Sequence, residues 1–357
     1  MSSSTPTPSN PVQELTDRIQ AIQWRMNSLQ SSVLLSTVKD AVEDLDTTVN
    51  GLSARLAAVR AAGYVFDADL DKKAEALSRQ WIQLRTNAQS QIAQQTPLLQ
   101  GDLRRAETQM TNLVAQRANL TLANSLAAAL ESTLSGIESK VSAAEGVVQG
   151  SYDAFQNEVQ EAGSRLTQIE WLMGQMAEAT FQLLPTEGVV AAVEAKWDKE
   201  GKEDPKGVLF LTDQRLLFEQ KEEVATKKVL FIATEKEKIH KLLLDGPVAQ
   251  IDQVKASKKG LMGHEDHLDV SFSLDGPVRA AHFHINGQDC NLWAGLVSRA
   301  KAKDFDKERI AKVDQAVLDK IAAAPTKCGN CGSPFTKPIM RGQTEIKCDY
   351  CGAVTRL

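Results

Sequence analysis

Residues 206–218 read KGVLFLTDQRLLF, and this stretch decides the fold of the central part of the chain. Apolar residues fill both halves, and the polar residues Thr212, Asp213 and Gln214 separate them. Thr and Asp favour a tight turn because their side chains accept hydrogen bonds from nearby backbone amides. Two short apolar runs on either side of a polar turn predict a pair of antiparallel β-strands.

Further strand patterns lie on both sides of this pair. One segment between them is ambiguous, because residues 233–247 fit either a strand with a turn or a short helix, and the sequence leaves this open. Residues 286–302 turn helical, with Cys290 and Trp293 on the apolar face. About seven strands closed by one amphipathic helix predict a small barrel or sandwich over residues 185–302. The other predicted strands are 188–197, 228–232, 248–260, 267–276 and 278–285.

The stretch 206–218 resembles GRAM and bacterial PH-like domains, which carry a similar glycine, apolar strand, LT-x-x-R-L turn and second apolar strand. The helix that contains Trp293 is similar to the C-terminal helix of that fold. The resemblance covers residues 185–302, about a third of the chain. It implies a PH/GRAM-like β-barrel with a C-terminal helix, and a surface that docks a protein or an anionic membrane.

The region 11–182 is predicted to be a long helical coiled coil, and the polar residues 1–10 before it a disordered tail. Apolar residues recur at spacings of three and four, with a register slip near residue 34. Gly63 and Pro97 interrupt the pattern, and Pro97 is expected to break or kink its helix. The first run consists of Val12, Leu15, Ile19, Ile22, Met26, Leu29 and Val33.

A seam of this length must pack on another segment or on another chain. The interruptions permit an antiparallel bundle within one chain, and the register slips permit a longer rod built from several chains. Both arrangements stay open, and a homo-oligomer formed through the coiled coil is one expectation. After the central domain, residues 303–324 are predicted to form an amphipathic linker helix that ends at Pro325.

The last segment, residues 325–357, contains four cysteines in two C-x-x-C pairs separated by sixteen residues. Two residues between cysteines let both thiolates face one tetrahedral ion, so the spacing predicts a zinc ribbon with one zinc ion. An iron site uses similar pairs, and spacing does not distinguish the two metals. A redox dithiol is disfavoured because no thioredoxin-like unit surrounds the pairs. The predicted ligands are Cys328, Cys331, Cys348 and Cys351.

Four cysteine ligands leave no open position for water, so the zinc is expected to be structural. A module of this size cannot bury enough core to fold alone, and the metal supplies the missing free energy. Lys337, Arg341, Lys347 and Arg356 give the module a modest basic surface. This surface supports a second interpretation of the protein, a nucleic-acid-associated factor.

Lipid binding would need a cluster of basic residues on the central domain. One loop contains Lys199, Lys202 and Lys206, diluted by acidic neighbours. The purer segment KASKKGLMG is the candidate lipid or partner contact. Its residues are Lys255, Lys258, Lys259, Leu261 and Met262.

The histidines suggest no site from sequence. His264 and His267 could form a metal pair, but no other ligand converges on them, so a polar loop is the prediction. His282 and His284 alternate along one strand and are expected to face solvent or a partner. No Walker A, G-x-G-x-x-G, G-x-S-x-G or H-E-x-x-H motif occurs, so no enzymatic activity is expected.

The net charge of −5 argues against a general nucleic-acid coat or a strongly basic membrane anchor. The N-terminus lacks the pattern of a signal peptide, no run of about 18 apolar residues occurs, and metal-type cysteine pairs fit a reducing cytoplasm. The sequence therefore predicts a cytoplasmic, non-enzymatic scaffold of α+β class. A protein partner is expected, with peripheral membrane contact as the variant and nucleic acid as the alternative.

Overall fold

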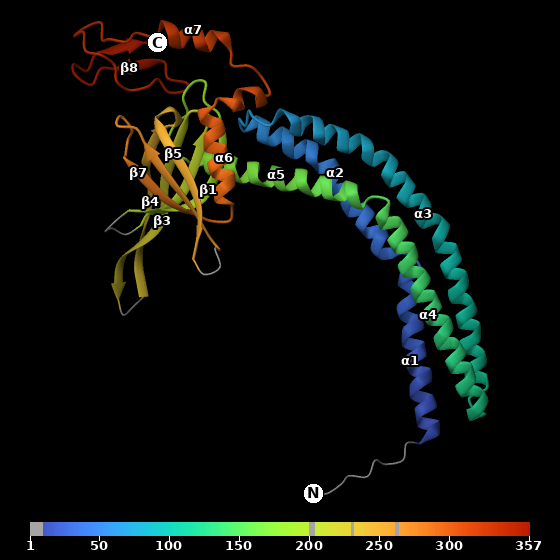
Figure 1. The fold of residues 1–357 in the computed structure, drawn as a ribbon. Coiled ribbons are helices and arrows are strands. Elements are labelled where there is room, and N and C mark those ends of the chain that lie inside the picture. Colours follow the sequence, from blue (N-terminus) through green and yellow to red (C-terminus); the bar gives the residue numbers. More distant parts are fainter. Residues whose placement is uncertain (1–9, 200–203, 230–231, 261–263) are drawn as a thin grey trace. The chain divides into compact units, whose positions relative to one another are not determined.

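The computed structural model describes residues 10–199, 204–229, 232–260 and 264–357, with the side chains of 223–238 left aside. The chain divides into two compact units. The first, called the helical unit, comprises Met1–Ala54 and Lys73–Ser164. The second, called the sheet unit, comprises Arg55–Lys72 and Arg165–Leu357. Figure 1 shows the elements along the chain.

The predicted long N-terminal helical region is confirmed. Asn10, the described residue of the predicted tail, caps the first helix by accepting a hydrogen bond from the Val12 amide. Among the described helices, none combines the length and apolarity needed to cross a bilayer. The helices are α1 (Pro11–Ser32), α2 (Ser36–Ala61), α3 (Ala68–Ala115), α4 (Leu120–Gly150) and α5 (Asp153–Ala177).

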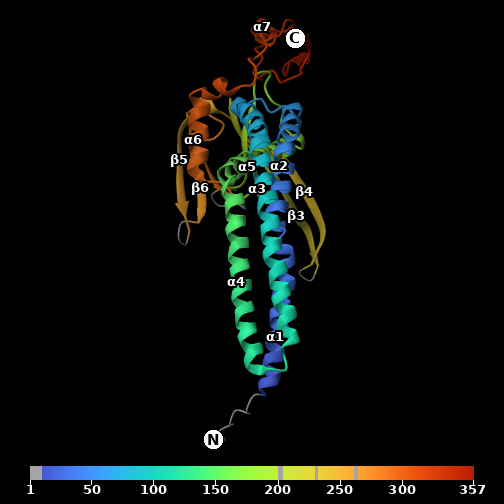
Figure 2. The ribbon, with the colours of Figure 1, turned by 90° about the vertical axis from the view of Figure 1, so that its right-hand side faces the viewer.

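Inside the helical unit, the chain folds back on itself, and α1, α3 and α4 run side by side (Figure 2). Arg18 of α1 forms an ion pair with Glu131 of α4 at 2.6 Å. The Trp81 ring of α3 stacks on Phe155 of α5, with ring centroids 5.4 Å apart. The apolar seams therefore find partners within one chain. Self-association of this region stays a prediction.

Two details of the helical region differ from prediction. The register slip near residue 34 is a break between helices, with Leu35 in the left-handed region at φ 54°. The buried Leu35 side chain anchors this turn. Pro97 does not break its helix, because α3 continues through it, and the kink that was the alternative stays a prediction. Burial of the nearby Leu99 and Leu103 offsets the one backbone hydrogen bond that proline removes.

The sheet unit contains seven antiparallel strands in the order β4-β3-β2-β1-β7-β6-β5. In the described residues the outer strands β4 and β5 do not pair with each other, so the sheet is open rather than the predicted closed barrel. Residues 233–247, left undecided from sequence, belong to β4. The strands are β1 (Val189–Asp198), β2 (Lys206–Thr212), β3 (Arg215–Val229), β4 (Ile232–Pro247), β5 (Ile251–Lys259), β6 (Glu265–Phe272) and β7 (Ala280–Ile285).

One face of this sheet forms the core. Alternate residues point to one side of a strand, and this places Trp197, Phe218 and Phe283 in contact at centroid distances of 5.4–5.8 Å. A short 3-10 helix, η1 (Val248–Gln250), precedes β5. Helix α6 (Cys290–Lys301) covers the core with Trp293, which is fully buried.

Residues 206–218 form the hairpin β2–β3, as predicted. Gly207 is required there because a Cβ atom at this position would lie 1.9 Å from the Glu219 carbonyl oxygen. The Thr212 hydroxyl accepts a hydrogen bond from the Arg215 amide at 2.6 Å and so closes the turn. The glycine and the threonine therefore set the approach of the strands and the turn between them.

Arg215 supplies a buried ion pair that the sequence did not reveal. Its Nε and Nη2 atoms donate to the two carboxylate oxygens of Glu187 at 2.9 and 2.7 Å. The Glu187 side chain is 0% exposed and that of Arg215 is 5% exposed. Asp245 accepts a third hydrogen bond from Arg215 at 2.9 Å. The arginine of the motif thus ties the start of β3 to Glu187, two residues before β1.

The linker helix is shorter than the predicted 303–324. A 3-10 helix, η3 (Asp304–Glu308), comes first, and α7 spans Gln315–Ala323. Phe305 is buried beside Phe66, and the Ile310 amide donates to the Val65 carbonyl oxygen. These tertiary contacts hold Phe305 and Ile310 outside an α-helix, although both lie in the segment that was predicted to form one. The C-terminal segment adds the two-stranded sheet of β8 (Glu345–Lys347) and β9 (Val354–Arg356).

Candidate functional site

The four cysteines of the C-terminal segment lie on two turns of the same geometry. The Gly332 amide donates to the Cys328 carbonyl oxygen, and the Gly352 amide donates to the Cys348 carbonyl oxygen, both at 2.9 Å. Both glycines have a φ of 73°, a conformation that favours glycine. The two C-x-x-C pairs are therefore matching knuckles. The β8–β9 pairing closes the hairpin of the second knuckle, and an isolated β-bridge between Lys327 and Pro334 closes the first.

The sulfur positions fit a tetrahedral metal ion. The Sγ atoms of Cys328 and Cys351 are 3.6 Å apart, and those of Cys331 and Cys348 are 3.7 Å apart. Four thiolates about 2.3 Å from a central zinc would be separated by roughly 3.8 Å. The structure thus brings all four predicted ligands together within 4.8 Å. The arrangement is consistent with zinc.

Two of the four thiols are shifted toward the form that binds metal. Hydrogen bonds from Ser333, first from its side chain and then from its backbone, lower the pKa of Cys331 to about 6. The backbone amides of Cys331 and Asn330 also lower the pKa of Cys328. Thiolates are the ligands of zinc, so these amides and the serine favour metal binding near neutral pH.

The basic residues of this module are partly engaged. The Lys337 ammonium pairs with Asp349 at 2.9 Å. Arg341 contacts the Glu187 carbonyl oxygen through its guanidinium, and its amide donates to the Leu183 carbonyl oxygen. Internal contacts therefore use two of the four charges on which the nucleic-acid interpretation rests.

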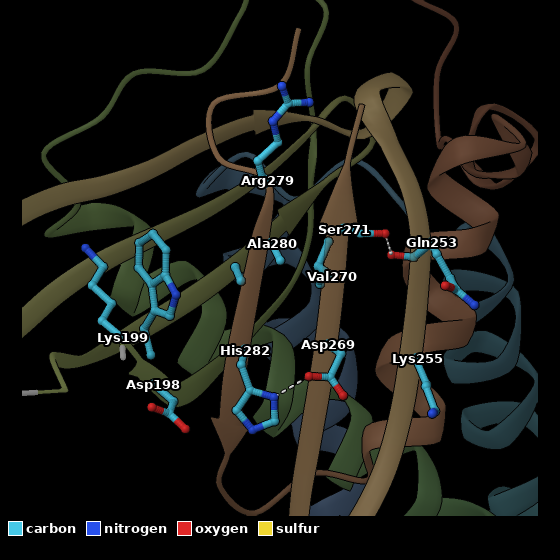
Figure 3. A pocket seen from close by; sticks show the side chains of 12 residues that line it. Asp198, Lys199, Gln253, Lys255, Asp269, Val270, Ser271, Arg279, Ala280 and His282 are labelled. Atoms are coloured by element: carbon cyan, nitrogen blue, oxygen red, sulfur yellow. Dashed lines mark hydrogen bonds and ion pairs between the residues drawn. The ribbon is translucent and has the colours of Figure 1, made fainter. Parts of the chain in front are cut away.

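A second feature is a pocket of about 690 Å³ on the sheet, at β1, β5, β6 and β7 (Figure 3). Three cations line it, Lys199, Lys255 and Arg279, together with the acidic residues Asp198 and Asp269. The Lys199 ammonium lies 4.0 Å from the centroid of the Trp197 ring. The pocket is therefore mixed in charge, with an aromatic ring and basic groups along its walls.

The predicted lysine cluster is not one surface. Lys255 and Lys259 belong to the same face of β5, because residues two or four apart share a face. Lys258 projects to the other face and pairs with Asp289 at 3.0 Å and with Asp266 at 3.5 Å. The two apolar members of the candidate contact, Leu261 and Met262, lie outside the described residues, as does Lys202.

Of the histidines on β6 and β7, His267 lies differently from the sequence-based expectation. His267 lies in β6 and is 9% exposed, so it does not belong to a polar loop. Strand pairing places His284 opposite His267 and His282 opposite Asp269, and both of these histidines are partly buried. The spacing of His282 and His284 was visible in the sequence, but the strand register that brings His267 to them was not.

No family model matches the chain, and no curated protein matches it. Among solved structures it is similar to the C-terminal domain of an unknown protein from Leishmania infantum, at 18% identity over 32% of this chain and 84% of that one, with a TM-score of 0.21. It is also similar to the DH/PH domains of PDZ-RhoGEF in complex with RhoA, at 12% identity over 83% and 96%, with a TM-score of 0.26. Inhibited Vav1 gives 9% identity over 81% and 84%, with a TM-score of 0.24. These TM-scores assign neither a fold nor a function.

Proposed function

We propose that this protein is a non-enzymatic cytoplasmic adaptor whose sheet unit, of PH/GRAM-like class, docks a protein partner. The observation that carries the proposal is the pocket of the sheet, which combines Lys199, Lys255 and Arg279 with the two carboxylates of Asp198 and Asp269. Protein surfaces offer charges of both signs, and polar rims are typical of protein interfaces. The zinc ribbon holds a second contact surface in shape.

A protein partner is favoured over an anionic membrane on charge. Binding to an anionic membrane depends on several basic residues that act together near the surface. Lys258 is paired with acidic side chains, and Lys255 shares its pocket with Asp269. Lysines on both faces of β5 thus have acidic side chains beside them, which lowers the attraction to a lipid surface. A peripheral membrane contact through Lys255 and Lys259 is the variant to be tested.

The experiment uses a photo-crosslinking amino acid in the full-length protein in its native cells. Placed at Lys255 or Arg279, it should give one discrete crosslinked protein; placed at Leu274, which is 79% exposed outside the pocket, it should not. Charge reversal of Lys255 should weaken the adduct formed from Arg279. Equal crosslinking from all three positions would contradict a docking site in this pocket.

Two further measurements separate the alternatives. Flotation with neutral vesicles and with vesicles that contain phosphatidylserine tests the membrane variant, and binding lost on replacement of Lys255 and Lys259 would transfer the function to lipid. A mobility-shift assay at low salt tests the nucleic-acid alternative. A shift lost on replacement of Lys347 and Arg356 would support it, because phosphate contacts are salt-dependent.

The helical unit is proposed to supply length and association. Light scattering at micromolar concentration measures this directly. A dimer or larger species that is lost when charged residues replace the exposed Trp24 and Ile82 of the helical unit would support association. Trp24 is 75% exposed and Ile82 is 66% exposed, so these changes leave the packed seam intact. A strictly monomeric protein would contradict it.

A further inference from the structure

Five ionisable side chains gather on the face of β6 and β7 that points away from the core. Glu265, His267 and Asp269 alternate along β6, and His282 and His284 alternate along β7. The intervening Leu268, Val270, Phe283 and Ile285 are buried in the core on the other face. The strand register places His284 opposite His267 and His282 opposite Asp269.

The three imidazole rings are stacked, with His267 in contact with both others. Its centroid lies 4.7 Å from that of His284 and 5.0 Å from that of His282. Polar contacts continue along the cluster. His267 Nδ1 lies 2.9 Å from His282 Nε2. His282 Nδ1 in turn contacts Asp269, as Figure 3 shows. On the other side, His267 Nε2 lies 3.4 Å from Glu265 Oε2.

These contacts form a row with one hydrogen too few. The row runs from Glu265 through His267 and His282 to Asp269, and its three contacts each need one hydrogen or one cation. Each neutral imidazole carries one N–H, and an ionised carboxylate carries none, so two hydrogens serve three contacts. One contact is therefore open to a third hydrogen, which would make one histidine cationic, or to a metal ion.

The geometry selects the contact between Glu265 and His267. At 3.4 Å it is the longest of the three, whereas His267 Nδ1 and His282 Nε2 lie at the ordinary hydrogen-bond distance of 2.9 Å and His282 Nδ1 contacts Asp269 directly. A third atom that could bind a metal also lies beside this contact. One ring nitrogen of His284 is within 4.8 Å of the potential ligand atoms of both Glu265 and His267. Two imidazoles and a carboxylate are a common ligand set for zinc.

We propose that Glu265, His267 and His284 bind a divalent transition-metal ion such as Zn²⁺ on the face of the sheet. His267 binds through Nε2, while its Nδ1–H donates to His282 and the Nδ1–H of His282 donates to Asp269. This pair of hydrogen bonds fixes the ring of His267 in the same way that carboxylates orient metal-bound histidines elsewhere. Three protein ligands leave one coordination position for water or for a side chain of a partner.

The surroundings allow such an ion. Burial first of all lowers the pKa of His267, and the neighbouring His284 and His282 add to this, although the Glu265 side chain raises it. A neutral imidazole is the form that binds metal. Lys259 stands opposite Glu265 on β5, and Lys196 stands opposite His284 on β1, where it is paired with Asp204 at 2.5 Å. Because Glu265 is 51% exposed, the ion is expected to exchange more readily than zinc held by four cysteines.

The test measures metal stoichiometry on the full-length, reduced protein with zinc already in the cysteine site. Equilibrium dialysis against free Zn²⁺ at micromolar concentration and pH 7.5, followed by elemental analysis, should give one exchangeable ion beyond the resident one. The variants Glu265→Gln and His284→Ala should each reduce its affinity by at least tenfold. Glu265→Gln keeps the shape of an exposed side chain, so it preserves the fold.

His264→Ala is the matched control, because His264 is an exposed histidine next to Glu265 but not part of the cluster. It should keep the exchangeable ion. Absence of a second ion in the wild-type protein would overturn the proposal, as would its retention in both Glu265→Gln and His284→Ala. Nitrogen-15 NMR of the imidazoles gives an independent measurement. An imidazolium signal from His267 that zinc leaves unchanged at pH 7.5 would show that a third hydrogen, rather than a metal, completes the row.

Discussion

The buried pair of Arg215 and Glu187 predicts a large and specific loss of stability. The variant Arg215→Met keeps most of the apolar stem but removes the guanidinium. In this variant the Glu187 carboxylate, which is 0% exposed, loses two charge-assisted hydrogen bonds. It still accepts hydrogen bonds from the Thr212 hydroxyl and the Leu184 amide. The charge remains buried without a counterion, which is the costly situation for an ion pair.

The magnitude follows from the two hydrogen bonds that the Glu187 carboxylate no longer accepts in this variant. Hydrogen bonds to charged groups contribute about 1.5–3 kcal/mol each, and removal of one partner of a buried pair costs about 3–5 kcal/mol. Both figures predict that the free energy needed to open the sheet falls by the same amount, about 3–5 kcal/mol. Since about 1.4 kcal/mol corresponds to a factor of ten, backbone amides of β2 and β3 should exchange roughly 100-fold to several thousand-fold faster.

Hydrogen exchange followed by mass spectrometry measures this on the full chain, because peptides from residues 206–218 report the sheet unit alone. The double variant Arg215→Met with Glu187→Met should recover most of the loss, since an apolar pair of similar volume is often as stable as a buried ion pair. Lys307→Met, which removes an exposed pair with Asp304, is the control and should change exchange little. A protection loss below tenfold in Arg215→Met would refute the reasoning.

Two further predictions concern the backbone of the sheet unit and the charges of the helical unit. Gly207→Ala should unpair β2 and β3, because its Cβ would meet the Glu219 carbonyl oxygen. The control is Gly295→Ala in α6, where the Cβ would enter open space, so this variant should leave stability unchanged or raise it. Thermal melting followed by circular dichroism distinguishes the two variants. A Gly207→Ala variant as stable as the wild type would contradict the close approach. In the helical unit, the hydrogen bond from Arg18 lowers the pKa of Glu131, so this contribution to stability is present above the pKa of the unfolded chain and is lost as pH falls through the lower folded pKa. The melting temperature should therefore drop between about pH 5 and pH 3, and Glu131→Gln should drop less; an equal drop in both would exclude this pair as a cause.

The sequence revealed those features whose signals are local. The hairpin of residues 206–218 was predictable because a tight turn and two apolar runs lie next to one another. The four cysteines were predictable because C-x-x-C spacing itself carries the geometry of a knuckle. The helical seams were predictable for the same reason, since a spacing of three and four defines one face of a helix.

Features that depend on register or on distant partners were not predictable. Glu187 lies 28 residues before Arg215, and nothing local links the two. Phe305 does not belong to the predicted α-helix, and its ring packs on Phe66, which is far away in the sequence. The histidine cluster depends on a strand register that one residue of slip would abolish. Local sequence patterns therefore predicted the helices, strands and cysteine turns. The ion pair and the histidine cluster depend on tertiary pairing, which those patterns do not contain.

The cysteine centre is the feature on which the C-terminal module depends, and it is measured most directly by X-ray absorption at the zinc edge combined with elemental analysis. The protein should be freshly reduced and dialysed against a competing chelator that removes exchangeable ions. We expect one zinc per chain with four sulfur ligands at about 2.3 Å, and its loss in Cys328→Ser/Cys331→Ser together with unfolding of the ribbon alone. A metal-free protein, or a zinc with oxygen or nitrogen ligands in place of sulfur, would contradict the zinc-ribbon assignment.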